Sequence, residues 1–178
     1  MNLKRINILF LYFGLSMLTF FSSLSAFEVK NIPVQSEGRV KPLDTFARNL
    51  LLRFYGKREI KDQKINATDW LLDLILYPQE GRQRKIFNIR NPEVVSSLFL
   101  DWYTDHKYSY NEIIDGLSSQ IDLINTIEQK DNSIRTPFDK QLLELSENAL
   151  IFEKLSYMKN IKLIPPALLD ENAVWQSP

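Results

Sequence analysis

The stretches "SYNEIIDGLSSQIDLINTI" (residues 109–127) and "TPFDKQLLELSENALIF" (136–152) decide the predicted fold class. Ser109 and Glu112 form a capping box at the start of the first stretch, and Thr136 precedes a proline at the start of the second. Apolar residues then recur at spacings of three and four: Tyr110, Ile114, Leu117, Ile121 and Ile124, and then Phe138, Leu142, Leu145, Ala149 and Phe152. A short polar link joins the two stretches, so we expect an antiparallel helical hairpin.

Three more helices are predicted upstream of this hairpin. The first opens at Pro42 or Leu43, where Asp44 or Thr45 is placed to satisfy its free amides, and it ends at Gly56. Asn66 caps a second helix that Pro78 stops, and Asn91-Pro92 begins a third that runs to about Trp102. Residues 27–34 are expected as an extended arm or edge strand and 86–89 as a short strand. The prediction is therefore a small, mainly α domain with short extended or β segments.

The first 26 residues have the order typical of an export signal. Lys4 and Arg5 precede an uncharged apolar run, and small residues end at Ala26. This segment is either a cleaved signal peptide or an uncleaved membrane anchor. Residues 27–178 are expected to form one domain outside the cytoplasm, in the periplasm. After Asn160, Pro165 and Pro166 favour an extended tail, and Trp175 is expected to be buried by the domain or by a partner.

Composition excludes several classes of function. Residues 27–178 carry 20 basic and 22 acidic side chains, so the basic excess that nucleic-acid binding needs is absent. The chain has no cysteine, which excludes disulfides, thiol chemistry and cysteine-held metals. None of the five glycines belongs to a phosphate-binding loop.

The candidates for chemistry are few. His106 lies near Asp101 and Asp105, but one histidine and two aspartates lack a fixed fourth metal ligand, so no metal site is predicted. No serine occupies a Gly-x-Ser-x-Gly turn. Carboxylate pairs such as Asp69 and Asp73 leave an exported carboxylate-dependent hydrolase as one alternative function. A general adaptor protein of the cell envelope is another.

Several residues are candidates for contact with a partner. Leu52 lies opposite the apolar stripe of the first helix, and an aromatic group surrounds His106. The predicted interaction patch consists of Leu52, Trp102, Tyr103 and Trp175. The basic residues Arg82, Arg84 and Lys85 are expected on a solvated loop, with pairing to partner carboxylates or anionic lipid headgroups as the alternative.

The stretch "IPVQSEGRVKPLDTFARNLLLRFYGK" (32–57) combines a turn, a proline and a helix start in close succession. It resembles the exported segment that precedes the membrane-embedded part of CcsA-type cytochrome c assembly proteins, the system II (ResB/CcsA) synthetases. The residues that carry the resemblance are Pro33, Val34, Gln35, Gly38, Arg39, Val40, Lys41, Pro42, Asp44 and Thr45. A looser likeness continues through the rest of the mature chain.

The resemblance implies a role in delivering haem to exported apocytochrome c. The family's haem-handling histidines and tryptophan-rich membrane segment have no counterpart in this sequence, which leaves two alternatives: a separate subunit of a split system, or a truncated synthetase. The expected function is a non-catalytic, membrane-proximal accessory domain that contacts a CcsA-type partner and apocytochrome c. The partner, and not this chain, would hold the haem. Arg39 and Lys41 would then face a carboxylate or haem propionate of the partner, and the alternative is that both are solvated or paired within the chain.

Overall fold

The structure is a computed structural model that describes residues 28–157 and 161–162. The predicted leader at 1–26 and the tail that contains Pro165, Pro166 and Trp175 lie outside the described residues. The described part is mainly helical, with two small antiparallel sheets of two strands each, as the sequence predicts. None of its helices is both long and apolar enough to cross a lipid bilayer.

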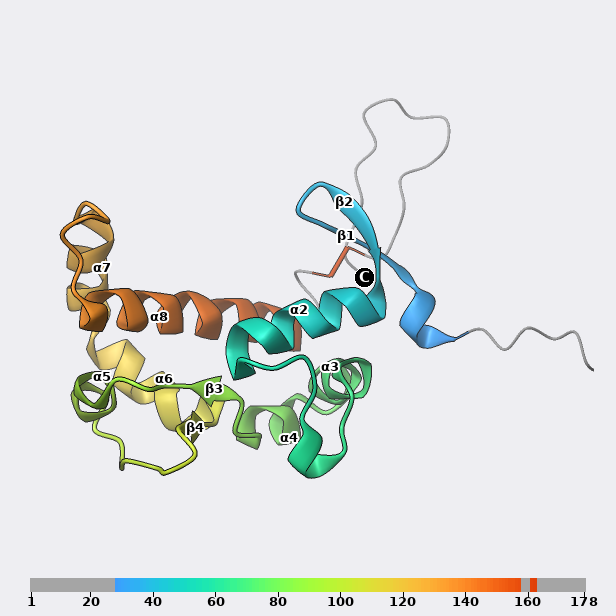
Figure 1. Cartoon of the computed structure of the whole chain (residues 1–178), viewed down its shortest axis with the longest axis horizontal. Coiled ribbons are helices and arrows are strands. Elements are labelled where there is room, and N and C mark those ends of the chain that lie inside the picture. The colour runs from blue at the N-terminus through green and yellow to red at the C-terminus, as the bar shows by residue number, and fades with distance from the viewer. Residues whose placement is uncertain (1–27, 158–160, 163–178) are drawn as a thin grey trace, which may run out of the picture.

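The elements follow one another in a simple order (Figure 1). The amino-terminal part contains η2 (Val29–Asn31), β1 (Pro33–Ser36), β2 (Arg39–Pro42), α2 (Leu43–Tyr55) and η3 (Lys61–Gln63). The middle contains α3 (Ala67–Leu76), α4 (Pro78–Gln83), β3 (Phe87–Asn88), α5 (Pro92–Ser97) and β4 (Lys107–Tyr108). The chain then forms α6 (Tyr110–Ser119), α7 (Ile121–Gln129) and α8 (Pro137–Ser156).

A cluster of aromatic rings around Phe152 of α8 joins the two ends of the molecule. The ring of Phe152 lies 6.1 Å from that of Phe54 in α2, 5.4 Å from that of Phe87 in β3 and 5.2 Å from that of Tyr110 in α6. Trp70 of α3 packs edge-on against Phe54 at 6.1 Å. Because these rings come from five elements far apart in sequence, their packing fixes how those elements sit together.

The predicted helical hairpin is present, but its first arm is two helices. In Figure 1, α6 leads to one end of the molecule, α7 lies at that end, and α8 returns through the middle. The break falls at Gln120, whose side-chain amide donates to Ser97 O at 3.1 Å. Ile121, expected in the apolar seam, is consequently 53% exposed.

Helix ends account for most of the confirmed local predictions. Ser109 and Glu112 form the predicted capping box, the Asn66 side chain caps α3, and Gly56 closes α2 in the left-handed conformation. The third helix was predicted too long: α5 ends at Ser97, because Phe99 adopts a left-handed conformation with φ 58°. Pro78 stops α3 as expected, and also begins the short helix α4.

Candidate functional site

The segment from Pro33 to Pro42 forms a β-hairpin in front of α2. Gln35 pairs with Val40, and the two turn residues, Glu37 and Gly38, have φ values of 54° and 73°. Positive φ at both central positions is what a type I′ turn requires. The turn at Gly38 was predicted, but the strand after it was not. The Glu-Gly pair between two short extended runs was the available signal.

The hairpin is held to the body of the domain on one edge. The amide of Gln35 donates to Lys162 O at 3.0 Å, and the amide of Leu43 donates to Ile32 O at 2.8 Å. Val34 is fully buried in the core. The position of the hairpin relative to α2 is therefore fixed by backbone bonds and by one buried side chain.

Asp44 braces two helices and does not cap one. Its carboxylate accepts hydrogen bonds from Arg48 Nε at 2.7 Å and from Thr68 Oγ1 of α3 at 3.1 Å. Burial by itself would raise the pKa of Asp44, but these two hydrogen bonds outweigh it and hold the pKa below its usual value. The prediction that Asp44 or Thr45 caps α2 is wrong. The residue at the capping position is Pro42, and no side chain makes a capping hydrogen bond there.

A groove of about 730 Å³ runs beside this brace, between η2 and the starts of α2 and α3. Its lining includes Lys30, Pro42, Asp44, Thr45, Arg48 and Asn66. Its charges are already paired: Lys30 with Glu28 at 3.0 Å, and Arg48 with Asp44 at 2.7 Å. The groove can therefore offer hydrogen bonds to a ligand, but its cations are committed to the chain's own carboxylates.

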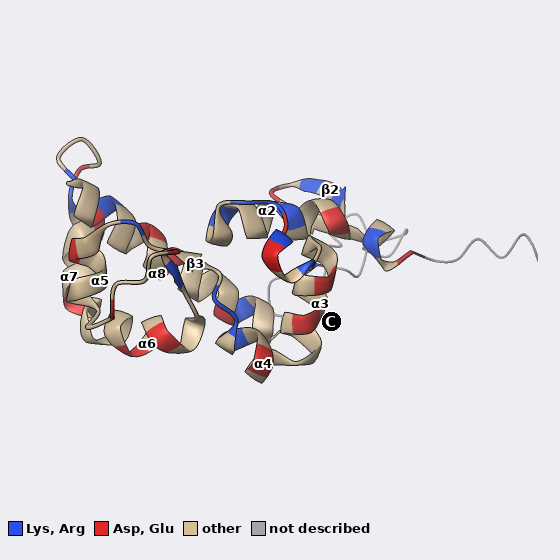
Figure 2. Ribbon diagram, turned by 60° about the horizontal axis from the view of Figure 1, so that its bottom comes forward, with Lys and Arg blue, Asp and Glu red and all other residues tan. Residues whose placement is uncertain are grey.

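The two cations predicted to face a partner differ in their surroundings. Lys41 pairs with Glu37 at 2.7 Å, and this hydrogen bond is the main reason that the pKa of Glu37 is lowered. Arg39 makes no ion pair or hydrogen bond with the described residues and is exposed beside Val40, which is 57% exposed. Figure 2 shows the basic residues of β2 and α2 on this part of the molecule. Only Arg39 stays available as an unpaired cation on the hairpin.

The remaining predicted contact residues do not form one patch. Leu52 is 43% exposed and lines a cavity of about 300 Å³ with Arg53, Arg90 and residues of α8. Trp102 is 47% exposed on the loop between α5 and β4, and no cavity or ring contact in the described part of the chain joins it to Leu52. Tyr103 stacks on Tyr108 at 5.1 Å and donates to Glu112 Oε1 at 3.1 Å.

Arg82 lies in a helix and not in the expected solvated loop, whereas Arg84 and Lys85 do lie in the connection between α4 and β3, where Lys85 is exposed. Arg82 lies in α4 and donates to Tyr157 Oη at 3.1 Å. Arg84 pairs with Asp73 at 3.2 Å, and Lys85 lies 3.6 Å from the Glu112 carboxylate. The ammonium of Lys85 also lies 3.7 Å from the centre of the Tyr103 ring. These three side chains are held by the chain itself.

Lys107 occupies a site that the sequence analysis missed. Its ammonium donates to Tyr55 O at 2.5 Å and lies 4.0 Å from the centre of the Tyr55 ring. Burial, and then the charges of Arg90 and Lys57, lower the pKa of Lys107 to about 8, while Asp105 opposes the shift. No spacing in the sequence could have indicated this site, since Lys107 and Tyr55 meet through the packing of β3 against α2 and the pairing of β3 with β4.

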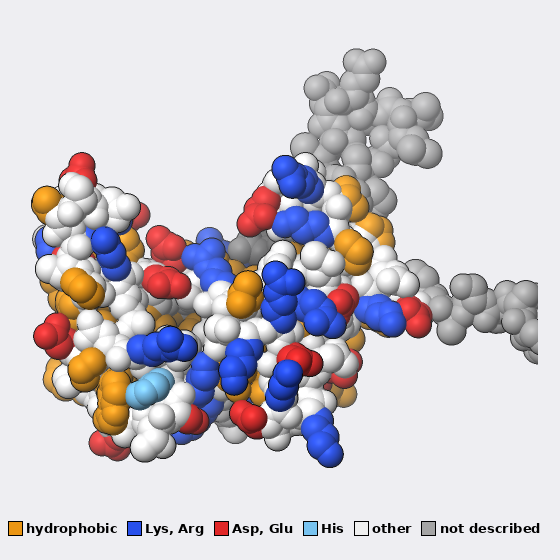
Figure 3. Space-filling view, in the orientation of Figure 1, with side chains coloured by type: hydrophobic (Ala, Val, Ile, Leu, Met, Phe, Trp, Pro, Cys, Tyr) orange, Lys and Arg blue, Asp and Glu red, His pale blue; other side chains and the backbone are white. Residues whose placement is uncertain are grey.

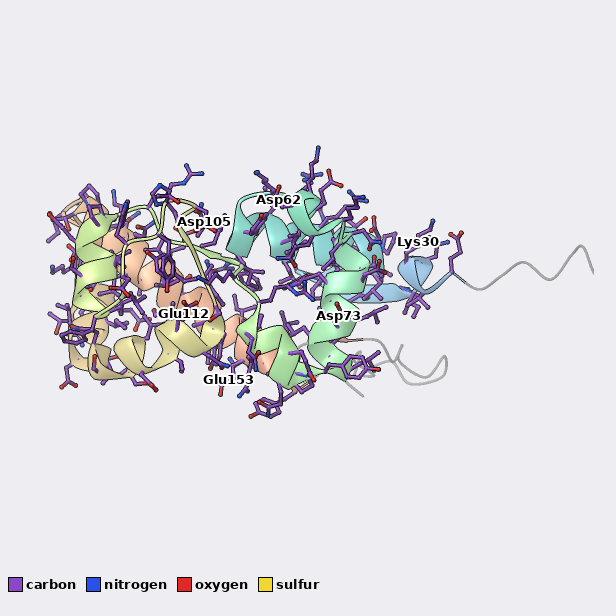
Figure 4. The ribbon with its side chains drawn as sticks, turned by 90° about the horizontal axis from the view of Figure 1, so that it is seen from below. Lys30, Asp62, Asp73, Asp105, Glu112 and Glu153 are labelled. Carbon is purple, nitrogen blue, oxygen red and sulfur yellow. The ribbon has the colours of Figure 1, made fainter. Side chains whose placement is uncertain are left out.

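An open cavity of about 490 Å³ adjoins Lys107, with Tyr55, Asp62, Glu80, Arg84 and Asp105 in its lining. Figure 4 labels Asp62 and Asp105 on the same side of the molecule, one from η3 and one from the loop before β4. A half-buried amine with a lowered pKa beside a cavity is a common feature of functional sites and also of structural ion networks.

His106 lies next to this site in a left-handed conformation, with φ 55°. Its ring is 4.7 Å from that of Trp102, and its Nδ1 is buried without a hydrogen-bond partner among the described residues. Within the described ranges, no three side chains of the histidine, cysteine, aspartate and glutamate types lie close enough to hold a metal ion.

Comparison with known proteins adds no relationship: no protein-family model matches the chain, and no curated protein matches its sequence.

Proposed function

We propose that this chain is an extracytoplasmic accessory domain in cytochrome c maturation, and that it works by contact and without catalysis. Its partners would be a CcsA-type membrane protein, which holds the haem, and the apocytochrome c that receives it. The proposal starts from the resemblance of residues 32–57. The observation that carries it furthest is the exposed side chain of Arg39, which makes no ion pair or hydrogen bond within the described residues.

Three of the signature residues have a direct structural role. Gly38 makes the turn, Lys41 pairs with Glu37, and Asp44 braces α2 against α3. Arg39 and Val40 have no such role, since both are exposed. Because successive residues of a strand face opposite sides, Arg39 and Val40 present a cation on one face of the hairpin and an apolar side chain on the other. The unpaired guanidinium suits contact with a partner that offers a carboxylate, such as an acidic side chain or a haem propionate.

The direction of the pKa shifts of the carboxyl groups favours a protein that acts by contact over a hydrolase. A carboxylate-dependent hydrolase needs a general acid whose pKa is raised. Among the described carboxyl groups, those with a shifted pKa are all shifted downwards: Glu37, Asp44, Glu112, Asp131 and Asp139. Each of them accepts hydrogen bonds within the chain, so their charges already serve local structure.

The test is complementation of a deletion strain, scored by covalent haem on c-type cytochromes. We expect deletion to abolish haem attachment and the wild-type chain to restore it. The double variant Arg39→Glu/Val40→Asp should fail to restore it while keeping its melting temperature. The matched control is Lys140→Glu/Leu150→Asp, which makes the same chemical changes at exposed positions of α8. Normal haem attachment in the deletion strain would overturn the proposal.

A further inference from the structure

The loop between α5 and β4 exposes two large aromatic side chains. Phe99 is 82% exposed and Trp102 is 47% exposed. Phe99 lies two residues after Ser97, the last residue of α5: its amide donates to Ser96 O, and the amide of Leu100 donates to Val95 O, both at 3.1 Å. These bonds define a Schellman motif, in which glycine is the favoured residue at the left-handed position. The chain carries an exposed phenylalanine there, with φ 58°, so the fold does not explain this choice of residue.

The loop is held rigidly beneath these two rings. Tyr108 is fully buried, its hydroxyl donates to Asp101 O at 3.0 Å, and it accepts a hydrogen bond from the amide of Tyr103. Tyr103 in turn stacks on Tyr108 and is partly buried. Phe99 and Trp102 are therefore presented by an ordered loop, which lowers the entropy lost when they bind.

A group of cations adjoins the aromatic pair. The amide of Ile89 donates to His106 O at 3.0 Å, which places Arg90 beside the histidine that contacts Trp102. Arg90 and Lys57 are both exposed, make no ion pair within the described residues, and lie near enough to Lys107 to act on its charge. Figure 3 shows Lys and Arg side chains gathered over this face, with the pale-blue histidine at their edge and hydrophobic side chains beside it.

We propose that the loop carrying Phe99 and Trp102, together with the exposed cations Lys57 and Arg90, docks the domain on an anionic phospholipid surface. Exposed aromatic rings partition into the interfacial region of a bilayer, and adjacent unpaired cations are attracted to acidic headgroups. Lys57 and Arg90 make no ion pair within the described residues, whereas Asp105, one of the two carboxylates of the loop, already accepts from the amide of Lys107. The ammonium of Lys107 is held by Tyr55 and faces a cavity that Asp62 and Glu80 also line, so the cations available to headgroups are Lys57 and Arg90. A lipid surface satisfies both the rings and the cations. The inference requires only a membrane and does not depend on haem delivery.

Tryptophan fluorescence tests this proposal directly. The full chain with Trp175→Phe retains Trp70, which is 1% exposed, and Trp102, so quenching by lipid-borne nitroxide reports on Trp102. With vesicles that contain phosphatidylglycerol, we expect the fluorescence of Trp175→Phe to be quenched at least twice as strongly as that of Trp102→Phe/Trp175→Phe, which lacks Trp102. Phe99→Ser and Lys57→Glu/Arg90→Glu, each added to Trp175→Phe, should remove at least half of that excess, and phosphatidylcholine vesicles should show little of it.

Two controls separate docking from general adhesion. Leu76→Ser changes another exposed hydrophobic residue, 64% exposed in α3, and Lys140→Glu/Lys154→Glu reverses two exposed cations of α8. When either control is made in the Trp175→Phe chain, its tryptophan fluorescence should be quenched to the same extent as in Trp175→Phe alone. Quenching that is equal with and without Trp102 would overturn the proposal. Loss of cytochrome maturation in Phe99→Ser without any lipid quenching would overturn it as well, and would assign the loop to a protein partner.

Discussion

Thr68 Oγ1 lies 3.1 Å from Asp44 Oδ1 and joins the start of α3 to the start of α2. Asp44 also accepts from Arg48, which lies one turn further along α2. One carboxylate therefore links α2 to α3 and also links two successive turns of α2. This contact gives a structural role to a residue that the sequence marks as part of a recognition signature. It also makes the stability of the amino-terminal part depend on the charge of Asp44.

The first prediction concerns this brace. Thr68→Val removes a hydrogen bond to a charged group and should lower the free energy of unfolding by about 1.5–3 kcal/mol. Urea unfolding of Thr68→Val, Asp44→Ala and the double variant measures the coupling between the two residues. We expect the losses in the free energy of unfolding of the two single variants to sum to more than the loss in the double variant, because each single change removes the same hydrogen bond. Full additivity would show that the contact contributes nothing.

The second prediction is the pH dependence of the same carboxylate. The pKa of Asp44 is lower in the folded state than its ordinary value of 3.8. The unfolded chain therefore binds more protons between these two pKa values, and stability falls as the pH drops through that window. The stability difference between the wild type and Asp44→Asn should stay constant from neutral pH to about pH 5 and shrink below about pH 4. Chemical denaturation across this range measures it.

The third prediction tests the close approach of α6 to the end of α5. A Cβ atom on Gly116 would lie 2.7 Å from Leu98 O and 2.9 Å from Leu98 Cβ, so Gly116→Ala must push the two elements apart. We expect a loss of about 1–3 kcal/mol in the free energy of unfolding. Ser118→Ala on the exposed side of the same helix is the control, and an equally small effect of both variants would contradict the packing argument.

The break at Gln120 and the short α5 show why the sequence could predict only part of this fold. Caps such as Ser109, Asn66 and Gly56 act within one turn of chain, so their residue types indicated the helix ends correctly. The end of α6 depends instead on a hydrogen bond from Gln120 to Ser97, and the end of α5 depends on an unusual left-handed phenylalanine. Contacts between distant segments override local propensity at these points.

The candidate sites divide in the same way. The turn at Gly38 follows from its residue type, and the exposure of Leu52 follows from its place opposite the apolar stripe of its helix. Lys107 was missed because its surroundings come from Tyr55, Lys57 and Arg90, which are distant in sequence and carry no common motif. The packing of β3 against α2 and the pairing of β3 with β4 bring them together.

The fourth prediction compares two substitutions of Phe99. Glycine adopts left-handed φ values without steric cost, whereas alanine retains the cost, which is about 1–2 kcal/mol for residues with a Cβ. Both substitutions remove the exposed ring, so Phe99→Gly should be more stable than Phe99→Ala by about 1 kcal/mol. Thermal unfolding of the two variants measures the difference. Equal melting temperatures would mean that the left-handed conformation at this position carries no strain.

The last prediction concerns the amine of Lys107. Its pKa of about 8 in the folded state lies below the ordinary lysine value of 10.5, so the unfolded chain binds more protons between these two values. Stability should therefore rise with pH from about 8 towards 10.5, in contrast to the behaviour of a lysine held in an ion pair. Reductive ¹³C-methylation followed by NMR titration would locate the pKa, with Lys107→Met identifying the resonance. Because Lys57 and Arg90 both lower this pKa, Lys57→Gln and Arg90→Gln should each raise it, whereas Lys140→Gln should leave it unchanged. A titration at the ordinary lysine pKa in the wild type would show that the amine is solvated and that the cations around it are too distant to act together.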